Sequence, residues 1–315
     1  MFISEPSVSV VIPVRDGERT IERAIRSALE QSSPPTEVIV VDDNSRDKTK
    51  QRVLELGRDR AVVVDGEGRG VAAARNAGIR SATSTWIAFL DGDDYWGTDF
   101  LKLARTRIAS APDAVACFGA ATHVNDTGQV IGRHDMQGTI TLEELVAGRI
   151  ATTASATLAR RDVVIECGGF CEDIRLAAED LDLWWRLAAR GPCVGFPQAA
   201  AVYVVHDARD RARSQDVLSQ MERDRELVIE RLAATGATRS LVRRGRAVMR
   251  ARTARYWLRA GRAADARATA RSSLRALPTL EGLGTLALAS LPRALRDPIL
   301  LLRRRQRAAG LLGRM

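Results

Sequence analysis

Three aspartates within four consecutive residues, Asp91, Asp93 and Asp94, are the strongest chemical signal in the sequence. They follow an apolar run that is typical of a buried strand. Carboxylates this close repel one another, and a divalent cation offsets that repulsion. Mn²⁺ and Mg²⁺ take oxygen ligands and often share them with substrate phosphates. The cluster therefore predicts a metal site. Its plainer alternative is a solvated turn whose aspartates cap the next helix.

A second acidic pair, Asp42 and Asp43, ends another apolar run and precedes Asn44 and Ser45. A carboxylate at such a strand end can accept hydrogen bonds from a nucleobase imide or from a ribose. The alternative is a turn that caps the following helix. Both interpretations place the pair at the end of a strand.

A glycine-rich turn, Gly68-x-Gly70-x-x-Ala73, follows a predicted strand and opens a predicted helix. This spacing fits the dinucleotide fingerprint, and Asp91 lies about 20 residues on, where a ribose-binding acid is expected. An NAD-dependent oxidoreductase is therefore an alternative function. Two features count against it, because the turn follows the third strand rather than the first and three acids replace the single one. In the same helix Arg75 could instead pair with a phosphate or a base.

Two acids, Glu179 and Asp180, open a predicted amphipathic helix. Acids are favourable at a helix N-terminus for electrostatic reasons alone. A carboxylate at a loop-to-helix junction can also face a pocket and accept a proton from a hydroxyl, as a general base does. His206 ends a later predicted strand, and we interpret it as an ordinary surface or core histidine in preference to a metal or phosphate ligand.

The elements that must position these residues alternate along the first hundred residues. Strands are predicted at 8–14, 38–41, 61–64 and 86–90, and helices at 21–29, 49–56 and 71–81. This alternation predicts a doubly wound, mostly parallel α/β sheet. Ligands bind at the carboxyl ends of the strands in such sheets. Pro13 and both acidic groups stand at those ends.

The rest of the chain divides into a mixed part and a helical part. Strands are expected at 115–121 and 200–205 and a helix at 180–189, and after residue 215 the pattern is helical. One helix pair is expected over 253–277, broken at Gly261 and ended by Pro278. We therefore expect a catalytic domain over 1–215 and a helical, arginine-rich region over 216–315.

Charge is distributed unevenly between these parts. The chain carries +9, and residues 236–315 carry +16 from nineteen arginines and three acids, so the first 235 residues carry −7. Such a basic region suits an anionic surface, either lipid headgroups or nucleic acid. No aromatic residue is interleaved with the arginines after Trp257, so we expect no nucleic-acid partner.

The apolar stretch 282–302 is too polar to span a bilayer and too apolar for a free linker, and its prolines should interrupt any helix there. Arg303, Arg304, Arg305 and Arg307 follow it directly. This order predicts a segment lying in the membrane interface. Packing on the catalytic domain or in a dimer interface is the alternative.

Composition bounds the class of protein. The chain has 315 residues, of which 45% are hydrophobic and 28% charged, as in globular proteins. No apolar run of 18 residues and no signal peptide is recognised. The four cysteines form no Cys-x-x-Cys pair, so we expect reduced thiols rather than a zinc site. These features favour a cytoplasmic protein, with peripheral binding at the inner face of the plasma membrane.

Six segments together resemble the family 2 glycosyltransferases, which have the GT-A fold. The resemblance covers about residues 7–206, and the segments occur in order at plausible spacing. They are VSVVIPV (8–14), VDDNSRD (41–47), GVAAARNAG (70–78), LDGDD (90–94), GGF (168–170) and EDLDL (179–183).

The resemblance implies transfer of a sugar from a nucleotide-diphosphate donor, with a UDP-sugar favoured, to an acceptor hydroxyl with inversion. It implies Mn²⁺ or Mg²⁺ as cofactor and a saccharide or lipid-linked acceptor in cell-surface polysaccharide or glycolipid synthesis. The roles it implies are base contact by Pro13 and Asp43, nucleotide contact by Arg75, ribose contact by Asp91, metal binding by Asp93 and general base by Asp180. Arg15-Asp16 replaces the usual Tyr-Asn, and Asn44 replaces a common Gly. A non-catalytic nucleotide-sugar-binding module remains a further alternative.

Overall fold

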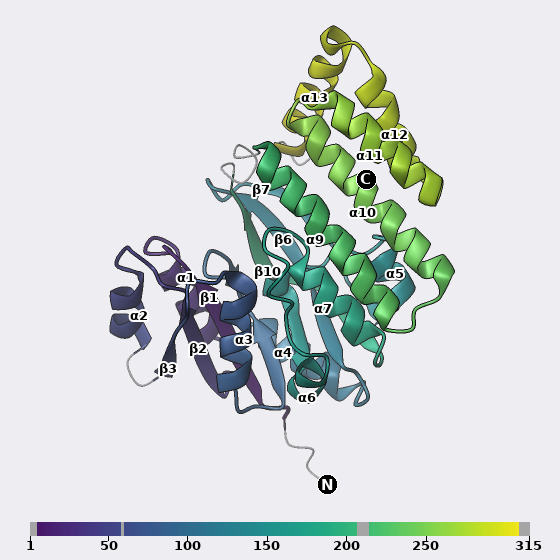
Figure 1. Ribbon diagram of the computed structural model, residues 1–315. Coiled ribbons are helices and arrows are strands. Elements are labelled where there is room, and N and C mark those ends of the chain that lie inside the picture. The colour runs from purple at the N-terminus through teal and green to yellow at the C-terminus, as the bar shows by residue number, and fades with distance from the viewer. Residues whose placement is uncertain (1–4, 58–59, 207–213, 309–315) are drawn as a thin grey trace.

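The computed structural model describes residues 5–57, 60–206 and 214–308, and its centre is one mixed sheet (Figure 1). Over these residues the sheet holds ten strands in the order β3-β2-β1-β4-β9-β6-β10-β5, with β7 added to β6 and β8 to β10. The parallel part comes first in the chain and the mixed part second. This is the mostly parallel α/β sheet, with a C-terminal helical region, that the sequence predicts.

The first half of the sheet is parallel and doubly wound, as predicted. Strand β1 pairs with β2 on one side and with β4 on the other, and β2 pairs with β3. The strands are β1 (Val8–Val14), β2 (Glu37–Asp42), β3 (Ala61–Asp65) and β4 (Trp86–Phe89). The helices between them are α1 (Ile21–Leu29), α2 (Thr49–Gly57) and α3 (Val71–Ser81).

The second half contains antiparallel strands that the sequence pattern did not indicate. The short strand β9 runs antiparallel to both β4 and β6 and joins the two halves. Strand β10 begins seven residues earlier than the expected 200–205 and pairs with β6 in parallel. The strands are β5 (Tyr95–Trp96), β6 (Ala116–Asn125), β7 (Val130–His134), β8 (Gly138–Ile140), β9 (Thr157–Arg160) and β10 (Cys193–Val205). The helices are α4 (Phe100–Ala109), α5 (Leu142–Val146), the 3₁₀ helix η2 (Ala154–Ala156), α6 (Arg161–Glu166) and α7 (Glu179–Ala188).

Apolar side chains alternate between the two faces of the sheet and build a core on each. Val10 and Ile12 of β1 pack on one face with Ile21 of α1 and Phe100 of α4. Val11 packs on the other face, in a cluster that also contains side chains of α3 and α7. Helices therefore cover both faces, as expected for a doubly wound sheet.

The C-terminal helices form two packing regions. Val228, Ile229 and Leu232 of α9 belong to the main core, whereas Trp257 and Leu258 belong to a separate small cluster. The helices are α9 (Gln215–Ala234), α10 (Arg239–Arg259), α11 (Ala263–Ala276), α12 (Leu280–Ser290) and α13 (Arg293–Ala308). None of the described helices has the length and apolar character needed to cross a membrane.

Two expectations for this region need correction. Helix α10 begins at Arg239 rather than near residue 253, because its many arginines hide the apolar periodicity from the sequence. Pro298 lies inside α13 without ending it. Ala294, whose carbonyl loses its helical partner at Pro298, is exposed, so water can bind that carbonyl. The break at Gly261, whose φ is 79°, is where it was predicted.

Candidate functional site

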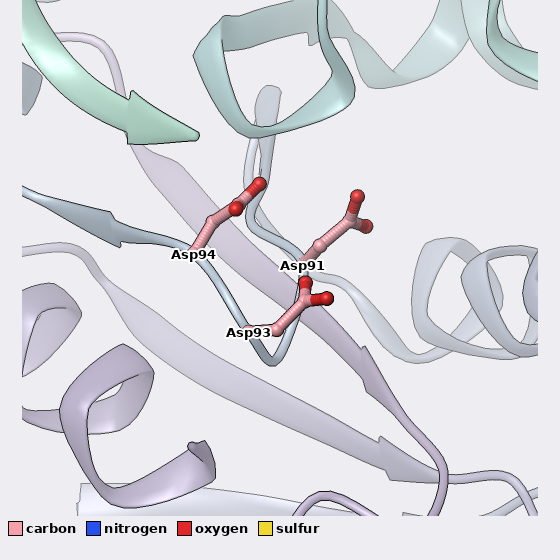
Figure 2. Close-up of side chains that lie close together, drawn as sticks. All are labelled: Asp91, Asp93 and Asp94. Carbon is pink, nitrogen blue, oxygen red and sulfur yellow. The ribbon is translucent and has the colours of Figure 1, made fainter. Parts of the chain in front are cut away.

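The three clustered aspartates lie on the turn between β4 and β5, at the carboxyl end of β4 (Figure 2). Their side chains converge, and one carboxylate oxygen from each lies within 4.8 Å of the others. The amide of Asp94 donates to the carbonyl oxygen of Asp91 at 3.0 Å and closes the turn. The predicted cluster is therefore a compact group of oxygen ligands.

Asp94 is the buried member of this cluster, with no exposed surface. Its carboxylate accepts from the Ser155 hydroxyl at 2.5 Å and from the amide of Val204 at 2.7 Å. Burial, followed by the charges of Asp91 and Asp93, raises the pKa of Asp94 well above its usual range. Asp94 therefore anchors the turn to β10 and η2, while Asp91 and Asp93 remain partly exposed.

His206, at the end of β10, lies against this cluster. Its Nε2 is 3.1 Å from Asp93 Oδ2, and its Nδ1 is 2.5 Å from Asp126 Oδ1. The sequence favoured an ordinary histidine at this position. Its meeting with Asp93, 113 residues away in sequence, depends on β10 and β4 sharing one sheet.

Arg75 of α3 joins the aspartate cluster to the acids that open α7. Its guanidinium is buried and donates to Asp91 Oδ1 at 2.6 Å and to Glu179 Oε1 at 2.9 Å. Its Cζ lies 5.1 Å from the centre of the Phe170 ring. Burial alone would lower the pKa of Arg75, but the two carboxylates outweigh burial and raise it. Glu179, which the sequence named only as a neighbour of Asp180, is therefore part of the site.

Asp180 is in the first turn of α7, directly after Glu179. Burial and the charge of Glu179 raise the pKa of Asp180 to about 7, against the opposing effect of Arg75. One carboxylate oxygen accepts from the amide of Leu181 at 2.7 Å. A carboxylate with this pKa can take up a proton at neutral pH, which suits a general base.

Asp43 has a different environment from the other acids. Its two carboxylate oxygens accept from the amides of Gly68 at 2.8 Å and Gly70 at 2.9 Å. Pro13, beside Val41 in the β1–β2 register, accepts through its carbonyl from the amide of Gly92 at 3.3 Å. The glycine-rich turn therefore directs two amides at an internal carboxylate. A dinucleotide-binding turn would direct them at a pyrophosphate.

Arg75 and the acids around it form one connected network. The structure connects Arg75 with Asp91 and Glu179, and it gathers Asp91, Asp93 and Asp94. Pro13 lies near the end of β1 and Asp43 directly follows β2, so both lie at the same edge of the sheet as the aspartates that follow β4. Ser155, which contacts both Asp91 and Asp94, carried no signal in the sequence.

Known proteins resemble this chain in both sequence and fold. The sequence profile of glycosyl transferase family 2 matches residues 9–170. The chain is 38% identical over 97 residues to the UDP-Glc:alpha-D-GlcNAc-diphosphoundecaprenol beta-1,3-glucosyltransferase WfgD of Escherichia coli, which covers 30% of this chain and 38% of WfgD. It is 30% identical over 171 residues to the glycosyltransferase AglE of Haloferax volcanii, which covers 52% of this chain and 56% of AglE. The matches thus span less than two thirds of either relative.

A solved structure extends the likeness to the helical region. The fold is similar to that of S. aureus TarS 1-349 in complex with UDP-GlcNAc, with a TM-score of 0.63 and 19% identity over 97% of this chain and 89% of that chain. At this identity the likeness concerns the fold. The family profile covers more than half of the sequence and includes the aspartate cluster and Arg75. The chain therefore belongs to glycosyl transferase family 2.

Proposed function

We propose that this protein is an inverting, metal-dependent glycosyltransferase that moves a sugar from a nucleotide-diphosphate donor to an acceptor hydroxyl. The observation that carries the proposal is the link that Arg75 makes between two acid groups. On one side lies a cluster of oxygen ligands, and on the other lies Asp180, whose pKa is raised to about 7. The reaction needs oxygen ligands for a metal-bound diphosphate and a base for the acceptor hydroxyl, and the two acid groups offer these.

The donor set of the aspartate cluster fits Mn²⁺ or Mg²⁺, because both prefer oxygen ligands. Asp94 has no exposed surface whereas the Asp93 side chain is partly exposed, so Asp93 is the principal metal-binding residue in this proposal, with His206 beside it. When bound, the cation stabilises the negative charge that develops on the departing nucleoside diphosphate.

Nucleotide binding is assigned to the residues at the adjoining strand ends. Pro13 and Asp43 contact the base, Arg75 contacts the nucleotide and Asp91 contacts the ribose. The two glycine amides hold the Asp43 carboxylate in one orientation, and each of its oxygens has a second lone pair for the base. Arg75 is held in a similar way by Asp91 and Glu179.

Asp180 acts as the general base in this proposal. It accepts the acceptor's hydroxyl proton as the oxygen attacks the anomeric carbon and the bond to the diphosphate breaks. A single displacement of this kind inverts the anomeric centre and needs no covalent intermediate. One positioned carboxylate is sufficient for it.

The donor class and the pathway are inferred from related proteins. WfgD is named for UDP-Glc and a diphosphoundecaprenol acceptor, and the Bacillus subtilis relative TuaG is named as a putative teichuronic acid biosynthesis glycosyltransferase. A UDP-sugar donor and a saccharide or lipid-linked acceptor are therefore proposed for this chain, in cell-surface polysaccharide or glycolipid synthesis. The catalytic domain is assigned to 1–215 and the helical region to 216–315.

We propose that the helical region binds an anionic membrane surface on the cytoplasmic side, because a lipid-linked acceptor would lie there. Leu280 and Leu283 of α12 are 89% and 51% exposed, and the acid of this helix, Glu281, is paired with Arg255 at 2.6 Å. Exposed leucines within a strongly basic region suit interfacial binding. The side chains of Arg303, Arg304, Arg305 and Arg307 lie outside the described residues.

Vesicle co-sedimentation tests the membrane proposal. The full chain should pellet with phosphatidylglycerol vesicles at low salt, and Leu280→Glu/Leu283→Glu should pellet several-fold less. Phosphatidylcholine vesicles are the control for charge. Equal pelleting of the two proteins would contradict a role for α12.

A donor panel tests the catalytic proposal. The chain is mixed with UDP-sugars, Mn²⁺ and saccharide or prenyl-diphosphate acceptors, and UDP release and the product's anomeric configuration are measured. Turnover with an inverted product is expected, and a retained configuration would contradict the mechanism. Thermal stabilisation by UDP and Mn²⁺ without turnover would support the non-catalytic alternative, whereas stabilisation by NAD(H) alone would support the dinucleotide alternative. Family membership and the Asp43 contacts count against the latter.

A further inference from the structure

The loop that leads into Glu179 and Asp180 is held by a carboxylate from the C-terminal helices. Asp224 of α9 is 1% exposed. Its Oδ2 accepts from the amides of Leu176 at 2.7 Å and Ala177 at 3.1 Å, and its Oδ1 accepts from the Gln220 side chain at 2.7 Å. Three donors therefore converge on one buried carboxylate.

Ile174 of this loop packs in the main core, but the backbone that follows it has two features that call for a further anchor. Leu176 is 49% exposed, so its side chain does not fix the backbone. Ala178, the N-cap residue of α7, has φ 70° and ψ 22°, and its side chain offers no capping hydrogen bond. Residues other than glycine adopt this left-handed conformation only when their surroundings enforce it. The two Asp224 contacts lie immediately before Ala178 and Glu179.

The same helix also holds α7 on the other side of Asp180. Asp182 is 1% exposed and accepts from Arg231 of α9 at 2.8 Å and from Arg186 of its own helix. Val228 and Ile229 of α9 pack in the main core with Leu183 of α7. Helix α9 thus contacts the chain both before and after the proposed base.

We propose that Asp224 is a positioning residue that fixes the 176–178 backbone and so sets the position of Asp180. The inference rests on the proposed function only for Asp180's role as base. Leucine is close to aspartate in size but has no acceptor oxygen. Asp224→Leu therefore removes the one oxygen, Oδ2, to which both loop amides donate. Small displacements of a reacting group are costly in rate.

The first test measures the loop itself and needs no substrate. In hydrogen–deuterium exchange of the full chain, Asp224→Leu should speed exchange at the Leu176 and Ala177 amides at least about tenfold, because their buried acceptor is lost. Glu226→Leu, two residues along α9 and paired with Arg250 of α10, is the matched control and should leave these amides unchanged. Unchanged exchange in Asp224→Leu would overturn the proposal.

The second test is a double-mutant cycle on turnover with the active donor of the UDP-sugar panel. Asp224→Leu should lower kcat about 10–100-fold with the donor KM within about twofold, and it should add no loss to Asp180→Asn. Unchanged kcat in Asp224→Leu, or a full additional loss in the Asp180→Asn background, would overturn the link to Asp180. If the wild-type chain turns over no donor, the proposed function fails, and the exchange experiment still decides whether Asp224 holds the loop.

Discussion

The two acid groups of the site differ in how their charges are stabilised. The first group is Asp91, Asp93 and Asp94. One carboxylate oxygen from each lies within 4.8 Å of the others, and the group is hydrogen-bonded to a hydroxyl, an amide and an imidazole. Glu179 and Asp180 lie at a helix N-terminus beside the Arg75 guanidinium. The first arrangement concentrates negative charge on three carboxylates, of which Asp91 and Asp93 are partly exposed, and it suits a cation. The second leaves one carboxyl with a pKa near neutrality and suits a proton. Arg75 contacts one acid from each group and so keeps the two groups adjacent.

The largest expected effect comes from removing the proton acceptor. Asp180→Asn should lower transfer by about 10²–10⁴-fold, the usual contribution of a general base. Binding of UDP with Mn²⁺, measured by calorimetry, should stay nearly unchanged. Asp173→Asn, an exposed position in the preceding loop, is the control. Normal turnover in Asp180→Asn, or a defect confined to nucleotide binding, would point to helix capping instead.

Removing a ligand of the cation should have the next largest effect. Asp93→Asn should reduce turnover about 10²-fold or more, because a metal contributes several kcal/mol of charge stabilisation. Unlike Asp180→Asn, it should also weaken Mn²⁺ binding in the presence of UDP. Asp99→Asn is the control, since Asp99 bonds to Ser32 and not to the cluster. Wild-type activity of Asp93→Asn at limiting metal would make the assignment wrong.

A substitution of His206 tests whether this side chain takes part in metal binding together with the aspartate cluster. His206→Asn should weaken Mn²⁺ affinity about 10–100-fold, the usual cost of losing a group that binds or orients a ligand. The ionisation of Asp180 should be unaffected, so the pH dependence of turnover should keep its shape. The check is Mn²⁺ titration of the UDP complex at constant pH. Unaltered affinity would show that His206 supports Asp126 and the β10 end alone.

The smallest expected effect is the change of kcat/KM with pH, which follows the ionisation of Asp180. Because the proposed general base acts deprotonated and Asp180 has a pKa of about 7, kcat/KM should rise about tenfold between pH 6 and pH 8 and then level off. The rise should be absent from the residual activity of Asp180→Asn. A flat wild-type profile would contradict the assignment.

The same pKa predicts a change in stability with pH. The folded-state pKa of Asp180 lies above its ordinary value of 3.8, so ionisation between pH 4 and pH 7 disfavours the folded state. Asp180→Asn should therefore have a higher Tm than the wild type at pH 8, and the difference should vanish near pH 4. A lower Tm for the variant at pH 8 would contradict the cited burial effect.

Much of the fold follows from local patterning. Continuous apolar runs such as residues 8–14 predict buried parallel strands, and the helices between them show helical periodicity. The acids that follow these runs must then meet at one sheet edge, because parallel strands end there. The sequence could not reveal β9, because four residues between two helical segments carry no clear period.

The sequence alone determined that Asp91, Asp93 and Asp94 form a cluster, because they are neighbours along the chain and follow a strand. Which distant groups meet them depends on how the chain folds. Arg75 and Glu179 are 104 residues apart, and Asp224 lies 48 residues from Leu176. Long-range contacts of single polar side chains leave no periodic trace, because they depend on how whole elements pack. The motifs therefore predict which residues could take part in the chemistry. Where these residues lie relative to one another depends on the assembled sheet and on α9.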